Sequence, residues 1–130
     1  MKTAQSSRIL QLTKKLCAIP SVSGSAAEEN RCADFITHCL FCLGLKHPGR
    51  VRVFEPVCER DPLERKAVFG LLRAAVPTDK TVVLTGHFDV VDTQNCGDKV
   101  QTAFDLERYT EALREQPLDE TARKDLESGN

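Results

Sequence analysis

A short apolar run that ends in a histidine and a carboxylate constrains this chain more than any other feature. Residues 81–84 read Thr-Val-Val-Leu, a pattern that predicts a buried strand, and the segment 85–93 follows at its carboxyl end. His87 and Asp89 stand two positions apart in that segment, so in an extended chain their side chains point the same way. Ligands of open α/β sheets bind at the carboxyl ends of strands. The pattern therefore predicts a sheet with a functional site at this strand end.

The residue types indicate a metal site. A histidine that binds a metal usually donates its second ring N–H to a carboxylate or a carbonyl, which fixes the tautomer and the direction of the ring. We therefore predict that His87 is a metal ligand, that Asp89 orients it, and that Gly86 allows close approach of the backbone. A strand-end histidine beside a solvated aspartate, with no function, is the alternative that the short motif leaves open.

The segment 85–92 resembles the first metal motif of the di-zinc hydrolases that include acetylornithine deacetylase, succinyl-diaminopimelate desuccinylase, aminoacylase and glutamate carboxypeptidase. In that family, Gly-His-x-Asp-Val-Val follows a Val/Leu strand. The resemblance covers most of residues 8–93, because residues 12–24 are similar to the family's opening helix and Ile-Pro-Ser turn, and residues 27–29 to the start of its second helix. Asp92 stands where many members have proline, and the motif looks most like that of the arginine-utilisation (RocB-like) branch.

The resemblance implies a fold and an activity. Residues 1–130 would be the N-terminal portion of one mixed-sheet α/β catalytic domain of the zinc-peptidase type. The complete enzyme would use two zinc ions and a general-base glutamate to hydrolyse amide bonds of N-acyl amino acids or small peptides, in arginine or other amino-acid catabolism. The family's bridging aspartate, paired glutamates and last histidine have no counterpart after Asp92. We therefore expect a fragment that ends before the remaining ligands and is inactive alone.

A function of a different class stays open. Catalytic zinc usually has three protein ligands, and the motif supplies one histidine. A truncated, non-catalytic domain that serves as a binding or assembly module is therefore the alternative to the hydrolase. Zinc stoichiometry and hydrolysis of an N-acetyl amino acid would separate the two hypotheses.

Composition narrows the range of partners. The 130 residues are 41% hydrophobic and 28% charged, with a net charge of -1, which offers no general attraction to nucleic acid or to an anionic membrane. The apolar runs fall short of the roughly 18 to 20 residues of a membrane span. We expect a cytoplasmic protein whose partner is a small-molecule or peptide substrate. The six cysteines are then expected to be reduced thiols.

Periodicity predicts two helices, three strands and a C-terminal helix. The first helix is expected to start at Ser6 or Ser7 and to end before Pro20, and the second to run from Ser25 to Gly44. The predicted strands are 51–55, 67–72 and 81–84, the last two as a hairpin in a mixed sheet, and the C-terminal helix covers 106–114.

We interpret several other polar residues as structural rather than functional. Ser21 and Ser23 are assigned to a turn, and Ser25 with Glu28 has the spacing of a capping box. Cysteines and apolar residues share one face of the second predicted helix, so its Cys-Leu-Phe-Cys motif is interpreted as a buried face. We disfavour a zinc site there because we place His38 nearly opposite Cys42 on the helix.

Overall fold

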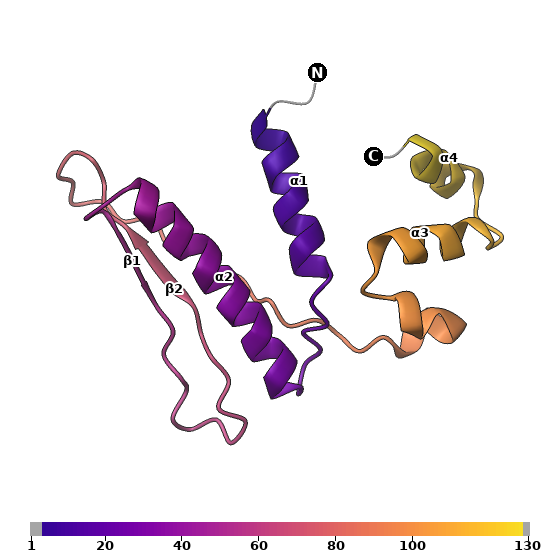
Figure 1. The fold of residues 1–130 in the computed structure, drawn as a ribbon, viewed down its shortest axis with the longest axis horizontal. Helices are drawn as coiled ribbons and strands as arrows, with labels where there is room; N and C mark the ends of the chain where they lie inside the picture. The colour runs from indigo at the N-terminus through magenta and orange to yellow at the C-terminus, as the bar shows by residue number, and fades with distance from the viewer. Residues whose placement is uncertain (1–3, 129–130) are drawn as a thin grey trace. The chain divides into compact units, whose positions relative to one another are not determined.

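The computed structural model describes residues 4–128 (Figure 1). The elements are α1 (Ala4–Cys17), α2 (Ala26–Lys46), β1 (Val51–Phe54), β2 (Phe69–Leu72), the 3-10 segment η1 (Gln94–Thr102), α3 (Leu106–Arg114) and α4 (Glu120–Ser128). The chain divides into two compact units, one made of residues 20–91 and the other of residues 1–19 with 92–130. Five helices and two antiparallel strands among the described residues are compatible with the α/β class.

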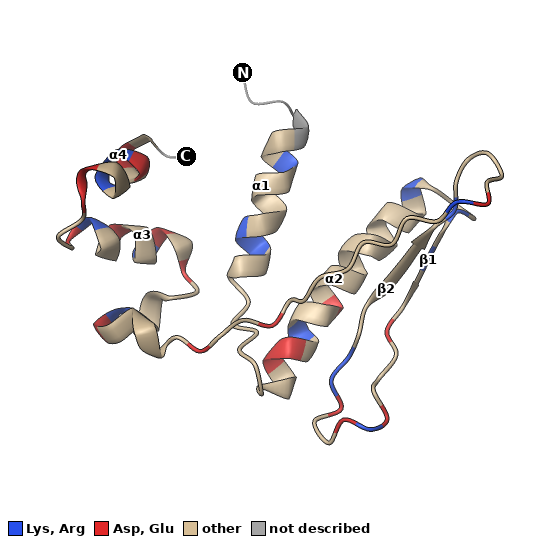
Figure 2. Ribbon diagram, turned by 180° about the vertical axis from the view of Figure 1, so that it is seen from behind, with Lys and Arg blue, Asp and Glu red and all other residues tan. Residues whose placement is uncertain are grey.

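The unit of residues 20–91 consists of α2 packed along a β-hairpin. β1 and β2 pair antiparallel, with Val51 opposite Leu72 and Phe54 opposite Phe69, and the two phenyl rings stack with centroids 5.2 Å apart. Helix and sheet approach closely at Gly70, where an added Cβ would lie 3.1 Å from the Leu40 side chain. Figures 1 and 2 both show α2 lying along the hairpin.

The core of this unit is small. Cys32 and Ala33, about two turns from the start of α2, are its buried apolar residues. Burial raises the pKa of the Cys32 thiol, and a side-chain hydrogen bond with Ser21 partly offsets that effect. All six cysteines are free. The helix is therefore the element around which the turn at residues 20–25 and the hairpin are organised.

The prediction of a third strand was wrong. Residues 81–84 are extended but have no strand partner in the described part of the chain, and their apolar side chains are exposed, with fractions of 83% for Val82, 80% for Val83 and 92% for Leu84. The hairpin joins β1 to β2 instead of joining residues 67–72 to 81–84. Strand β2 is also exposed at all four positions. An apolar run becomes a buried strand only when neighbouring strands and a second layer cover it.

The predicted helices agree with the structure better than the predicted strands do, and the differences lie at the helix ends. α1 starts at Ala4, so Ser6 and Ser7 lie inside the helix rather than at its N-cap. α2 passes through Gly44 and ends at Lys46. The predicted helix 106–114 is confirmed, with the Asp105 side chain accepting a hydrogen bond from the Arg108 backbone N–H.

The second unit contains α1, η1, α3 and α4. α3 contacts both η1 and α4, and the Tyr109 hydroxyl lies 4.0 Å from Cys96 Sγ. Figure 2 shows acidic and basic residues together on α4, where Lys124 pairs with Glu120 one turn earlier. No helix among residues 4–128 has the length and apolar character needed to cross a membrane.

Candidate functional site

The predicted metal motif is held against the Pro-Ser turn, more than 60 residues earlier in the chain. Val22 and Val90 form an isolated parallel bridge, with Val90 N donating to Ser21 O and Ser23 N donating to Val90 O, both at 2.9 Å. The Ser21 hydroxyl adds a 2.6 Å hydrogen bond to Phe88 O. The structure thus brings together the two segments on which the family resemblance rests.

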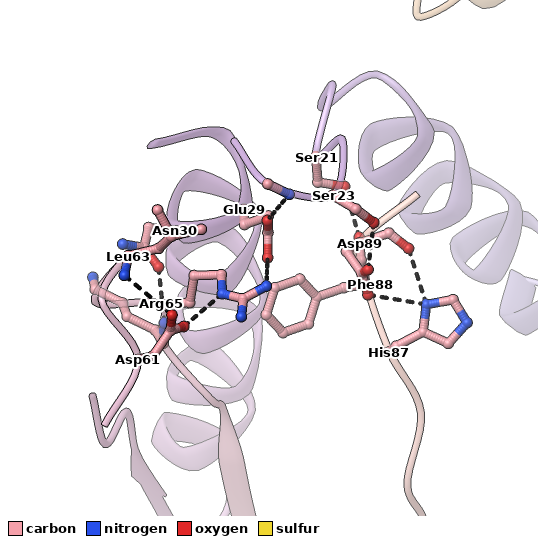
Figure 3. A network of polar contacts seen from close by, with 12 residues as sticks. Ser21, Ser23, Glu29, Asn30, Asp61, Leu63, Arg65, His87, Phe88 and Asp89 are labelled. Carbon is pink, nitrogen blue, oxygen red and sulfur yellow. Dashed lines mark hydrogen bonds and ion pairs between the residues drawn. The ribbon is translucent and has the colours of Figure 1, made fainter. Parts of the chain in front are cut away.

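His87 lies beside Asp89, and its ring nitrogen Nδ1 contacts that residue. His87 Nδ1 lies 2.9 Å from the Asp89 backbone oxygen and 3.2 Å from its carboxylate oxygen Oδ1 (Figure 3). Both partners are acceptors, so these bonds require a proton on Nδ1 and leave the lone pair of the neutral ring on Nε2. The side chain is 85% exposed, so Nε2 is accessible to an external ligand.

Asp89 receives a second, shorter hydrogen bond on its other oxygen. The Ser23 hydroxyl donates to Asp89 Oδ2 at 2.6 Å. This bond, more than any other contact, holds the pKa of Asp89 below its ordinary value; desolvation opposes the shift, and the Asp89 backbone N–H and the His87 imidazole add to it. The Asp89 carboxylate is therefore ionised at neutral pH, which is the state that accepts hydrogen bonds from both sides.

A buried carboxylate fixes the turn that carries Ser23. Glu29 is 5% exposed, and its Oε1 accepts a 2.7 Å hydrogen bond from Gly24 N. Its Oε2 lies 3.7 Å from Arg65 Nη1, and Arg65 Nε lies 2.5 Å from Asp61 Oδ2. Figure 3 shows these side chains as a continuous polar network that starts at the loop of the hairpin and reaches the turn.

The polar network also shifts the pKa values of Asp61 and Arg65. The Arg65 side chain, followed by the Leu63 backbone N–H, lowers the pKa of Asp61, and Asp61 raises the pKa of Arg65. Both groups are therefore charged at neutral pH. The charged pair fixes the position of Arg65 beside Glu29.

An open cavity of about 1070 Å³ lies beside the motif. Its lining includes His87 and Asp89 from the motif, Arg65 and Glu29 from the polar network, and apolar side chains of β2 such as Phe69. Ligand pockets commonly have volumes of about 300 to 1,000 Å³, with a mainly apolar lining and a few placed polar groups. The arrangement is therefore large enough for a small organic ligand or a short peptide beside the imidazole.

Within residues 4–128, no three His, Cys, Asp or Glu side chains converge in a way that could hold a metal ion. Zinc ligation by His87 and the orienting role of Asp89 during ligation therefore stay predictions. The geometry of the pair itself, with Nδ1 bonded and Nε2 accessible, fits the donor arrangement of a single histidine ligand.

The sequence interpretation missed the residues that hold the motif. Ser23 was assigned to a turn, but its hydroxyl bonds the site carboxylate. The expected capping box is absent, because the Ser25 side chain makes no cap hydrogen bond, and Glu29 rather than Glu28 reaches back, to Gly24 N. The sequence offered one signal for these contacts. Ser21 and Ser23 are two positions apart, which is also the spacing of His87 and Asp89.

The placement of His38 opposite Cys42 was also wrong. Residues four apart on a helix lie on nearly the same face, and the structure places Cys42 Sγ 3.5 Å from His38 Nε2. The argument against a four-ligand zinc site on α2 therefore loses its stated reason.

A helix packed on an antiparallel hairpin, beside a fixed Gly-His-x-Asp segment, is compatible with an α/β protein that has a ligand site next to the motif. The chain is similar to Protein RocB of Bacillus subtilis (strain 168), with 28% identity over 122 residues. The match covers 94% of this chain and 21% of that protein, so the chain spans about a fifth of the length of this relative. No protein-family model and no solved structure matches the chain. The similarity supports the RocB-like branch of the resemblance.

Proposed function

We propose that the chain is the N-terminal part of a metal-dependent hydrolase that cleaves amide bonds of N-acyl amino acids or small peptides, in arginine or other amino-acid catabolism. The observation that carries the proposal is the His87–Asp89 pair, in which the ring is held through Nδ1 and Nε2 stays accessible. Metal-binding histidines usually have this arrangement. The similarity to Protein RocB and the resemblance of residues 8–93 to the di-zinc hydrolases support the reaction class.

Zinc is the proposed metal, with His87 Nε2 as the ligand atom and Asp89 as the residue that orients the ring. When bound, zinc supplies polarisation of the amide carbonyl and a lower pKa of bound water. Because catalytic zinc usually has three protein ligands, we assign the other ligands to segments outside these 130 residues. The open cavity beside His87 is the proposed place for the substrate.

A metal titration of the 130-residue chain tests the ligand role. We would add substoichiometric Ni²⁺ to ¹⁵N-labelled protein that carries His38→Gln, a change that removes the imidazole beside Cys42. Paramagnetic broadening is expected at residues 87–90 and is expected to vanish after His87→Gln. His47→Gln is the matched control, because His47 caps α2 away from the motif. Broadening that survives His87→Gln, or that never reaches the motif, would contradict the ligand role.

The reaction class is tested in a longer protein that contains this chain. Hydrolysis of N-acetyl amino acids is expected to disappear after His87→Ala and to fall by about 10- to 100-fold after Asp89→Asn, the size common for a residue that orients a metal ligand. Activity that is unchanged in both variants would exclude this role for the motif.

One observation favours the second candidate, a non-catalytic binding or assembly module. The side chains of residues 82–84 form a run of exposed apolar surface, and contiguous surface of this kind marks interaction sites. This candidate predicts self-association or partner binding that does not depend on zinc or on His87. Analytical ultracentrifugation of the chain with and without His87→Gln would distinguish it from the hydrolase.

A further inference from the structure

The contacts of Ser23 point to a role beyond that of a turn residue. Its hydroxyl proton faces two acceptors, Asp89 Oδ2 at 2.6 Å and Val90 O at 3.2 Å. One hydroxyl carries one proton, so the shorter contact to the charged oxygen dominates, because hydrogen bonds to ionised groups are shorter and stronger than neutral ones. Ser23 therefore fixes one oxygen of the carboxylate.

Fixing Oδ2 determines where the other carboxylate oxygen lies. With Oδ2 bonded to Ser23, the planar group has its second oxygen, Oδ1, 3.2 Å from His87 Nδ1. Without that bond, the carboxylate of Asp89 could rotate about its side-chain torsions toward solvent, since the residue is only partly buried. The position of Oδ1 is thus set by a residue 66 positions earlier in the chain.

Ser23 is itself held in place from two directions. Its backbone N–H donates to Val90 O at 2.9 Å, and the next residue, Gly24, donates its N–H to the buried carboxylate of Glu29. Gly24 has a φ of +92°, a conformation that glycine adopts readily, so the chain can turn there and bring its N–H to Glu29. The hydroxyl is therefore pre-organised rather than drawn to Asp89 by chance.

We propose that Ser23 is a positioning residue for His87: its hydroxyl holds the Asp89 carboxylate so that the imidazole keeps its proton on Nδ1 and presents Nε2 outward. The importance of this role for activity rests on the proposed function, a metal-dependent hydrolase in which Nε2 is the ligand atom. The hydrogen bonds of Asp89 with Ser23 and with His87 form in the metal-free chain. They can therefore be tested without a metal.

The test is the tautomer of His87, read from long-range ¹H–¹⁵N NMR spectra at about pH 8.5, where an ordinary imidazole is neutral. His87→Gln assigns the signal among the three histidines. The 130-residue chain is expected to show mainly the Nδ1–H tautomer. Ser23→Ala is expected to lower the ratio of Nδ1–H to Nε2–H by up to about fivefold, the effect of one net hydrogen bond. The shift is limited because the bond from Nδ1 to the Asp89 carbonyl remains.

Three further variants separate positioning from a general effect on the turn. Ser23→Thr keeps the hydroxyl and is expected to restore the original ratio. Ser25→Ala, two positions later in the same turn, removes a side chain without a cap hydrogen bond and is expected to change nothing. Ser23→Cys keeps the side-chain size but has a weak donor; it is expected to resemble Ser23→Ala and replaces that variant if Ser23→Ala does not fold.

The outcomes also separate this inference from the proposed function. An unchanged tautomer ratio in Ser23→Ala and Ser23→Cys would overturn the positioning role, whatever metal the chain binds. A changed ratio without Ni²⁺ broadening at residues 87–90 would leave the positioning role intact and contradict the metal proposal. A ratio that changes equally in Ser25→Ala would show that the turn as a whole, and not the Ser23 hydroxyl, acts on His87, and would also overturn the inference.

Discussion

Residues 81–87 and residues 88–90 belong to one continuous stretch of chain, yet their surroundings differ. The first part has no backbone hydrogen bond to another segment of the described chain, and its apolar side chains are exposed. The second part is bonded to the turn at residues 21–23 by main-chain and side-chain hydrogen bonds. The exposed part thus contains the apolar run and His87, and the held part contains Asp89.

Hydrogen-bonding partners, and not hydrophobicity, therefore fix the position of this stretch. An apolar run gains free energy only when another surface covers it, and the described residues offer 81–84 no such cover. The motif, by contrast, is fixed by directional bonds to Ser21 and Ser23, whose turn is tied to Glu29. We therefore expect the stability of residues 20–91 to depend on α2 and the turn rather than on the apolar run.

The largest effect is expected in the core of α2. Ala33 has no exposed surface, so Ala33→Asp would bury an unpaired charge and is expected to lower the free energy of unfolding by more than about 3 kcal/mol. Val83→Asp places the same side chain on the exposed run and is expected to change stability by less than about 0.5 kcal/mol. Urea unfolding measures both. Equal losses of stability in the two variants would mean that the apolar run is packed.

A smaller loss is expected when the turn loses its anchor. Glu29→Ala leaves Gly24 N–H and Arg65 without their buried partner and is expected to cost about 2 kcal/mol. Glu28→Ala is the matched control, because Glu28 pairs with the more exposed Arg31, and exposed ion pairs contribute about 0 to 1 kcal/mol. Urea unfolding with the Gly24 amide signal as a local probe would measure both. A neutral Glu29→Ala would show that the turn holds its shape without the network.

Ser21→Ala tests the attachment of the motif more locally. Loss of the 2.6 Å bond to Phe88 O is expected to lower stability by about 1 kcal/mol and to speed hydrogen exchange at Val90 N–H, which donates to Ser21 O. Exchange at the amides of α2 should change less, because local opening releases the motif before the helix. Uniform acceleration over the whole unit would contradict a local role.

The smallest effect is a pH dependence that comes from Asp61. Its pKa is lowered in the folded protein, chiefly by Arg65, so its contribution to stability is present above the pKa of the unfolded chain and is lost as the pH falls through the folded value. The stability difference between the original protein and Asp61→Asn is therefore expected to be constant near neutral pH and to shrink below about pH 4. Denaturation at a series of pH values would measure it, and a difference that grows on acidification would have the wrong sign.

Helical elements could be predicted well from the sequence because their signals are local. The apolar spacing of residues 9–16 and 106–114 predicts the helices that the structure contains, with errors only at their ends. The Asp105 cap also comes from a short-range interaction that a sequence pattern can indicate. The prediction of a third strand failed because a strand needs a partner strand elsewhere in the chain. The composition of residues 81–84 carries no information about whether such a partner is present.

The residues of the candidate site and their spacing could be read from the sequence alone. The chemistry of His87 and Asp89 and the two-residue period of an extended chain were sufficient to predict that the carboxyl group would face the imidazole. The residues that hold that pair could not be read from the sequence, because the contact of Ser23 with Asp89 depends on how distant segments meet. Hydrogen bonds across 66 residues require a particular path of the chain, and that path is set by packing around α2 and the turn rather than by any local pattern.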